Sequence, residues 1–185
     1  MAKGTASSGG PEGGRFKQGP QPGSLTRVLL VDDNDRYAKS LTEDLHRRGV
    51  EDIVRAVNAK EGVELLRARG DEFDGVVSDI SMEHQISGLR VLRVARALDK
   101  QRRATVIART DDPRQQSLRG HQAQDESTTL RPLMVACATT GLDTPAGYQF
   151  NKFLLGTLYR CDFLIPKRPI KRDGKVFWIR GAKVW

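Results

Sequence analysis

The sequence predicts a doubly wound α/β fold built on a five-stranded parallel sheet. Between residues 26 and 98, short β-branched runs alternate three times with helical patterns, and the third run, Gly75–Asp79, is apolar on both faces. Acids end two of these runs: Asp32 and Asp33 follow the first, and Asp79 closes the third. Because functional groups of such sheets gather at the carboxyl ends of the strands, these acids mark the expected site.

The first half of the chain predicts three strands, at 27–31, 52–57 and 75–79. A helix follows each strand, with side chains for one face at intervals of three or four residues: Tyr37, Ala38, Leu41 and Leu45, then Val63 and Leu66, then Leu89, Leu92, Ala95 and Leu98. Asn34 or Asp35 can cap the first helix and Asn58 the second, and the glycines at 49 and 70 end them.

Two segments of the second half compete for the fourth strand, 105–108 and 133–138. The polar stretch between them, about 111–131, is interpreted as an insertion. Residues 148–159 have a helical pattern that predicts Phe150, Phe153, Leu154 and Leu158 as core, and 162–165 predict the fifth strand. Residues 175–179 alternate like a strand rather than a helix.

Composition divides the chain into a tail, a domain and a basic end. Residues 1–24 are rich in Gly, Pro, Ser and Gln and are predicted to be disordered, 25–170 form the domain, and 171–185 are basic with Trp178 and Trp185. The formal net charge of +8 permits nucleic-acid or other anionic partners, and the aromatic content of 6% gives no aromatic-rich stacking surface.

Cysteine usage and hydropathy bear on the compartment. Cys137 and Cys161 lack metal-ligand spacing and are predicted to be buried intracellular thiols. No apolar leader or bilayer-length apolar run is present, so a cytoplasmic protein without membrane insertion is expected.

Three carboxylates brought together by two strand ends predict a cation site. An anionic pocket of this kind is costly unless a divalent cation or a proton compensates it, which points to Mg²⁺ and phosphoryl chemistry. The competing interpretations are that Asp32 and Asp33 only cap the following helix and that Asp79 is a loop acid.

Four motifs, taken in order, resemble the receiver domain of two-component response regulators. They are Val-Asp-Asp-Asn-Asp after the first strand, Ser-Asp-Ile-Ser-Met after the third, Ser87-Gly88-Leu89 at a helix start, and Phe-Leu-Ile-Pro-Lys-Arg-Pro after the last. The resemblance covers about 26–98 strongly and the rest to 170 in part. It implies a flavodoxin-like signalling switch rather than a metabolic enzyme, phosphorylated on Asp79 by a sensor histidine kinase or a phosphotransfer protein and read by a downstream protein partner.

The resemblance also implies a role for each site residue. Asp33 and Asp79 would coordinate Mg²⁺, with Asp32 holding a bound water and the backbone carbonyl of Ser81 as a further ligand. Lys167 would reach the phosphoryl group as a point charge. The switch hydroxyl would be Thr110 by spacing or Thr139 by burial, coupled to Phe163 as the switch aromatic.

Departures from the family pattern keep other functions open. The family's Lys-Pro pair is split as Lys167-Arg168-Pro169, so Arg168 competes for the lysine position. The last helix of the family is missing, so the 177–178 segment, a partner or a second copy of the chain in a homodimer must cover part of the sheet. The alternatives are a docking module that works without phosphorylation, a nucleic-acid binder using the basic end, and a Mg²⁺-dependent phosphohydrolase using Asp33-Asn34-Asp35.

Overall fold

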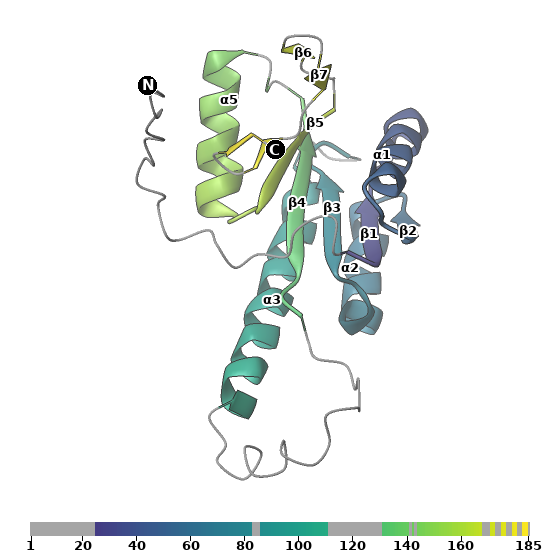
Figure 1. Ribbon diagram of the computed structural model, residues 1–185, viewed down its shortest axis with the longest axis vertical. Helices are drawn as coiled ribbons and strands as arrows, with labels where there is room; N and C mark the ends of the chain where they lie inside the picture. Colours follow the sequence, from purple (N-terminus) through teal and green to yellow (C-terminus); the bar gives the residue numbers. More distant parts are fainter. Residues whose placement is uncertain are drawn as a thin grey trace, which may run out of the picture.

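A computed structural model of the chain describes residues 25–82, 86–110, 131–140, 142 and 144–167, together with four short strands between 171 and 184. Figure 1 shows a central sheet with helices on both of its faces. Among the described residues, no helix combines the length and the apolar character that crossing a membrane requires.

The sheet contains five parallel strands, as predicted. They are β1 (Arg27–Val31), β2 (Asp52–Ala56), β3 (Gly75–Asp79), β4 (Met134–Thr139) and β5 (Phe163–Pro166). Their order is β2-β1-β3-β4-β5, and the register sets Val31 beside Ser78 and Asp79 beside Ala138. The chain winds outward in both directions from the β1–β3 pair, which is the position where ligands bind in open α/β sheets.

The C-terminal segment adds strands that the five-stranded prediction did not include. β8 (Ile179–Arg180) pairs antiparallel with β5, and β9 (Lys183–Val184) pairs with β8, so the sheet has seven strands. β6 (Lys171–Arg172) and β7 (Lys175–Val176) form a separate two-stranded sheet. The expected strand at 175–179 is therefore two short strands, and residues 177–178 lie outside the described ranges. After β5, the described residues form the four short strands β6 to β9.

The helices begin where the sequence places caps. They are α1 (Asp35–Arg47), α2 (Ala59–Arg69), the 3₁₀ turn η2 (Gly70–Glu72), α3 (Gly88–Thr110), α5 (Pro145–Asn151) and the π-helix η3 (Lys152–Leu158). The Asn34 side chain accepts from the backbone N–H groups of Arg36 and Tyr37, and the Asn58 side chain accepts from that of Glu61. These contacts satisfy donors that the first helical turn leaves unpaired.

The core has two layers, one on each face of the sheet. On one face α2, α3 and η3 bury residues that include Val63, Leu66, Leu92, Ala95 and Leu155. On the other face α1 buries Ala38, Leu41 and Leu45. The predicted inward faces of the first three helices are confirmed, although Tyr37, Leu89 and Leu98 are only partly buried.

Of the two candidates for the fourth strand, 133–138 is confirmed, because it coincides with β4, whereas 105–108 is wrong, because these residues continue α3. The third helix does not stop at Leu98, since its buried stripe continues through Asp99 and Arg102, which are 5% and 3% exposed. Both side chains have partners: Asp99 accepts from the backbone of Leu133, and Arg102 donates to the carbonyl of Phe73 at 3.0 Å. In the sequence, charged residues such as Asp99 and Arg102 indicate a solvent-exposed surface. The buried face of the helix beyond Leu98 could therefore not be recognised from the sequence pattern.

The prediction that Phe150, Phe153 and Leu158 are core residues is also wrong. These side chains are 64%, 59% and 60% exposed, whereas Leu155 is fully buried. The helix changes from α to π at Lys152, so the four-residue spacing that holds for an α-helix no longer marks the inner face.

Some expectations fall outside the described residues. These are the disordered tail at 1–24, most of the insertion at about 111–131, the alternative lysine position Arg168 with Pro169, and the aromatic residues Trp178 and Trp185.

Candidate functional site

The acids predicted from the strand ends lie together in the structure. Asp32 and Asp33 directly follow β1, and Asp79 is the last residue of β3, the strand beside it. One ligand oxygen from each carboxylate lies within 4.8 Å of the others. Asp32 and Asp79 are buried, whereas Asp33 is exposed, so the cluster opens to solvent on the Asp33 side.

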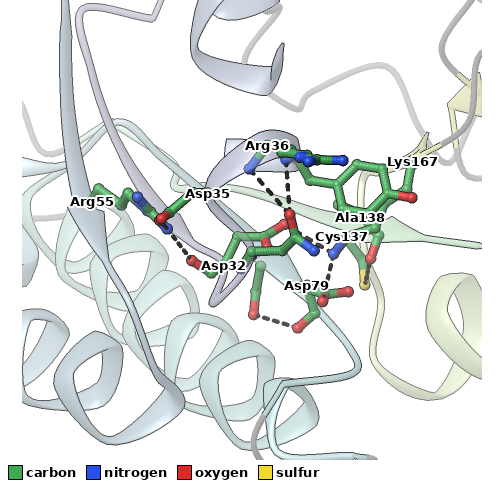
Figure 2. A network of polar contacts seen from close by, with 11 residues as sticks. Asp32, Asp35, Arg36, Arg55, Asp79, Cys137, Ala138 and Lys167 are labelled. Carbon is green, nitrogen blue, oxygen red and sulfur yellow. Dashed lines mark hydrogen bonds and ion pairs between the residues drawn. The ribbon is translucent and has the colours of Figure 1, made fainter. Parts of the chain in front are cut away.

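Lys167 completes this cluster from the end of β5. Its Nζ atom lies 2.6 Å from Asp79 Oδ2 and 3.0 Å from Asp32 Oδ2. Figure 2 shows Lys167 and Asp79 facing each other across the end of the sheet. The three side chains are 6%, 4% and 0% exposed in the order Lys167, Asp79, Asp32, so this is a desolvated group of two carboxylates sharing one ammonium.

The pKa values of Asp79 and Lys167 are both raised above their ordinary values. Burial raises the pKa of Asp79 above its ordinary value, and the hydrogen bond from Lys167 only partly offsets this. Burial lowers the pKa of Lys167, but its hydrogen bonds to Asp79 and Asp32 outweigh burial and leave that pKa raised. Lys167 is therefore a fixed cation at neutral pH, and among the described residues it is the side chain whose charge offsets that of Asp79.

Backbone contacts hold the turn that carries Asp32 and Asp33. The Asn34 N–H donates to Asp32 Oδ1 at 2.9 Å. Arg55, on the neighbouring β2, donates to the carbonyl oxygen of Asp32 at 3.1 Å and to Asp35 Oδ1 at 2.7 Å. These bonds join the end of β1 to the start of α1, as Figure 2 shows, and they fix the direction of the Asp32 carboxylate.

Tyr37, which the sequence predicts on the inner face of the first helix, also lies at the site. The Nζ atom of Lys167 lies 4.7 Å from the centroid of the Tyr37 ring, within the range of a cation–π contact. Tyr37 and Lys167 are brought together by the fold alone, and no local signal in the sequence connects them. The ring and the two carboxylates together restrict where the ammonium of Lys167 can lie.

Gly88 brings the start of α3 against the end of β3. A Cβ atom at this position would lie 1.7 Å from the carbonyl oxygen of Asp79, so only glycine permits this approach. The Gly88 N–H donates to the carbonyl of Ile80 at 3.1 Å. The packing of α3 against the end of β3 therefore requires the glycine of the Ser87-Gly88-Leu89 motif.

The two candidate switch hydroxyls are in different places. Thr110 is the last residue of α3 rather than the end of a strand, so its proposed position at a strand end is corrected. Thr139 ends β4, one residue beyond the partner of Asp79, and is 6% exposed. The Thr139 hydroxyl donates to the carbonyl of Thr140 at 3.0 Å and lies 3.4 Å from Asn151 Oδ1, where α5 meets η3.

The remaining candidates lie at the edge of the cluster or in the core. The backbone of Ser81 hydrogen-bonds to the Asp79 carboxylate. Phe163 begins β5 opposite Ala136, whereas Thr139 pairs with Pro166 three positions on, about 10 Å along the strand. Phe163 is 1% exposed and belongs to the layer on the α1 face, so its role as a switch aromatic stays a prediction.

The arrangement suits a hard divalent cation. Three carboxylates and one ammonium leave a net negative charge, and carboxylate oxygens are the ligands that Mg²⁺ takes while it keeps several waters. The Asp33 side is open for such waters and for a small anionic substrate. Lys167 adds a point charge able to pair with an oxyanion beside Asp79.

Comparisons with known proteins agree with this geometry. A family model described as the response regulator receiver domain matches residues 28–125. The chemotaxis protein CheY of Treponema pallidum (strain Nichols) is 32% identical over 95 residues, which are 51% of this chain and 65% of that protein. The chain thus spans just under two thirds of the length of this relative.

Solved structures are similar as well. A chain in the co-crystal structure of the Saccharomyces cerevisiae phosphotransfer protein Ypd1 with the receiver domain of Ssk1 has a TM-score of 0.49 and 18% identity, covering 79% of this chain and 80% of that one. The receiver domain of the histidine kinase CKI1 from Arabidopsis thaliana, complexed with Mg²⁺, has a TM-score of 0.46 and 19% identity, covering 77% and 83%.

Proposed function

The chain belongs to the response regulator receiver domain family, and on this premise we propose that it is a signalling switch that accepts a phosphoryl group on Asp79. Receiver domains act in signalling with histidine kinases or phosphotransfer proteins rather than as metabolic enzymes. The observation that carries the proposal is the desolvated group at the end of the sheet, in which Lys167 Nζ lies 2.6 Å from the acceptor carboxylate.

Asp79 is the nucleophile in this proposal. One carboxylate oxygen forms a bond to the phosphorus of the donor, the bond from phosphorus to the donor's leaving atom breaks, and the leaving group departs with the electron pair. The raised pKa of Asp79 supports this assignment, because a poorly solvated carboxylate is a stronger nucleophile than one at the surface. Lys167 then pairs with a phosphoryl oxygen, and its contact with Tyr37 keeps it close.

Asp33, Asp79 and the backbone carbonyl of Ser81 would hold Mg²⁺ directly, and Asp32 would hold one of its waters. The fit is supported by the carboxylate oxygens that lie within 4.8 Å of one another. When bound, Mg²⁺ supplies positive charge that offsets the negative charge of the phosphoryl oxygens. Until then Lys167 is the main counter-charge of Asp32 and Asp79 among the described residues.

Thr139 is the residue that we propose to relay the signal. In the unphosphorylated chain its hydroxyl lies 3.4 Å from Asn151, which is 8% exposed and donates to the carbonyl of Gly147 at 2.8 Å. A phosphoryl oxygen on Asp79 is a stronger acceptor and would draw the hydroxyl away from the Thr140 carbonyl, to which it donates at 3.0 Å, and from Asn151. The junction of α5 and η3 would then shift, and with it the exposed Phe150 and Phe153, which offer an apolar surface to a downstream protein.

One observation favours a second candidate, a docking module that works without phosphorylation. Phe150, Phe153 and Leu158 are already exposed in the unphosphorylated chain, and Lys167 already compensates the acids. Mg²⁺ affinity discriminates the two functions, because a docking module has no need of the ion. Millimolar or tighter Mg²⁺ binding that Asp33→Ala abolishes supports the phosphorylated switch.

The proposal is tested by intact-mass spectrometry after incubation with acetyl phosphate, with and without Mg²⁺. We expect one phosphoryl adduct that requires Mg²⁺, is lost in Asp79→Asn and is kept in Asp71→Asn, which makes the same change at an exposed acid (75% side-chain exposure). A folded wild-type chain that forms no adduct, or an Asp79→Asn variant that still forms one, contradicts the assignment.

A further inference from the structure

A second cleft lies at the opposite end of the sheet from the acids, where β5 begins. It has a volume of about 890 Å³, lies between α3 and η3, and has Cys161 and Asp162 among its lining residues. A hollow of about 350 Å³ adjoins it and shares Arg96 and Arg160 as walls. These volumes fall in the range of small-ligand sites. Figure 1 shows α3 and the α5–η3 helix that border this region.

One wall of the cleft is a basic stripe on α3. Arg93, Arg96, Lys100 and Arg103 follow one another at intervals of three, four and three residues, which places them on one face of the helix. Arg160 adds a fifth cation from the end of η3, on the opposite wall.

Only part of this charge is neutralised. Arg96 pairs with Asp99 at 3.1 Å and with Asp162 at 2.8 Å, and Arg103 pairs with Asp99 at 2.9 Å. These two acids compensate two of the five cations. The other three cations have no acidic partner within 4 Å among the described residues: Arg93, Lys100 and Arg160.

The backbone at Arg160 is notable because its φ is +53°, in the left-handed region that glycine adopts most easily. The Arg160 carbonyl accepts a hydrogen bond from Arg96, which fixes the conformation. Arg160 lines both hollows at a backbone conformation that glycine would adopt at lower cost. Arg160 directly follows the C-cap of η3, where a left-handed residue commonly ends a helix, and this turn sets it at the mouth of both hollows.

The smaller hollow has an aromatic wall. The Arg93 guanidinium lies 5.7 Å from the centroid of the Tyr159 ring and donates to its hydroxyl at 3.3 Å. Leu158, which is 60% exposed, lines the same hollow. A ring, a planar guanidinium and an exposed apolar side chain together form a platform on which a flat heterocycle can stack.

We propose that this cleft binds a nucleoside polyphosphate, independently of phosphorylation at Asp79. The base lies against Tyr159 and Leu158 in the smaller hollow, and the phosphates lie between Arg160 and Lys100 in the larger one. Arg160 and Lys100 line the larger hollow, and Arg93 adds a third uncompensated cation from the adjoining one. Together they suit the charge of about −3 that a nucleoside diphosphate carries near neutral pH, which favours a diphosphate over a monophosphate.

The test is fluorescence anisotropy of ADP labelled on the ribose, titrated with the full chain. We expect saturable binding that unlabelled ADP displaces, and at least tenfold weaker binding for Arg160→Gly and for Lys100→Gln. Arg160→Gly is a sharp probe because glycine accepts the +53° φ, so its thermal midpoint should not fall below that of the wild type. Lys39→Gln, which removes one exposed lysine from α1, should bind like the wild type.

Competition identifies the ligand class. ADP should compete at least tenfold better than pyrophosphate, and Tyr159→Leu should remove most of this preference while leaving pyrophosphate binding unchanged. The proposal is overturned if binding does not saturate, if Arg160→Gly binds like the wild type, or if pyrophosphate competes as well as ADP. A single-stranded oligonucleotide that displaces the probe at lower phosphate concentration than ADP would also overturn it, in favour of a nucleic-acid groove.

Discussion

Replacing Lys167 with methionine tests the buried charge group at the site. The variant keeps an unbranched side chain that is one atom shorter, but it leaves Asp32 and Asp79, which are 0% and 4% exposed, without their ammonium. Breaking a buried ion pair by removing one partner costs about 3–5 kcal/mol. Protonation of one carboxyl sets an upper limit to this cost, because a neutral carboxyl no longer needs the ammonium. For a carboxyl with an ordinary pKa of 3.8, protonation at pH 7 costs about 4 kcal/mol. We therefore expect a loss of about 3–4 kcal/mol at pH 7 in the presence of a chelator.

The loss should depend on pH and on Mg²⁺ in predictable directions. Protonation becomes easier as the pH falls, so the penalty should shrink to about 2 kcal/mol at pH 5. A cation that binds only the folded chain restores stability by mass action, by about 2.7 kcal/mol at a concentration one hundred times its dissociation constant.

Urea unfolding measures this effect as a change in the midpoint urea concentration, while the dependence of the unfolding free energy on urea concentration stays the same. Lys39→Met, at an exposed position of α1, is the matched control and should change stability by less than about 0.5 kcal/mol. Adding Asp79→Asn to the Lys167→Met variant should recover much of the loss, since one charge of the buried pair is removed. A loss below about 1 kcal/mol that does not change between pH 5 and pH 7 would refute the reasoning.

Three further predictions concern the packing around the site and the core. Gly88→Ala should cost about 1–3 kcal/mol and slow phosphorylation of Asp79 by acetyl phosphate, because its Cβ would meet the Asp79 carbonyl at 1.7 Å; an unchanged rate would be inconsistent with this contact. Arg102→Met should cost about 3 kcal/mol in urea unfolding, since it leaves buried carbonyl acceptors without their charged donor; a loss below about 1 kcal/mol would exclude this role. Burial raises the pKa of Cys161 to about 12 and that of Cys137 well above its ordinary value, so neither thiol should react with iodoacetamide at pH 8 in the folded chain. Because the unfolded chain loses the Cys161 proton from about pH 9, this thiol should lower stability by about 1.4 kcal/mol per pH unit between pH 9 and 12, and Cys161→Ala should remove that contribution.

The acidic part of the site could be predicted because it depends on local sequence. Asp32, Asp33 and Asp79 directly follow apolar runs, and the rule that parallel strands end at one edge brings them together without knowledge of distant contacts. The caps at Asn34 and Asn58 are local in the same sense. Patterns that span only a few residues of one element were sufficient to predict the structure of the first half of the domain.

Features that depend on tertiary contacts could not be predicted. Arg102 looks like a surface residue of a helix end, yet the carbonyls of Phe73 and Arg131 accept its donors and allow α3 to continue. The π-helix moves Phe153 outward by a change of backbone period that no residue type announces. The contact of Tyr37 with Lys167 joins residues that are 130 positions apart in the sequence.

Locating the phosphoryl group is the most direct test of the central claim. The full chain is incubated with acetyl phosphate and Mg²⁺, the acyl phosphate is reduced with borohydride, and the modified residue is found by tandem mass spectrometry of the digest. We predict that the modification lies on Asp79 and disappears when Mg²⁺ is chelated. A modification on Asp32, Asp33 or any other residue, or one that forms equally well without Mg²⁺, would contradict the account.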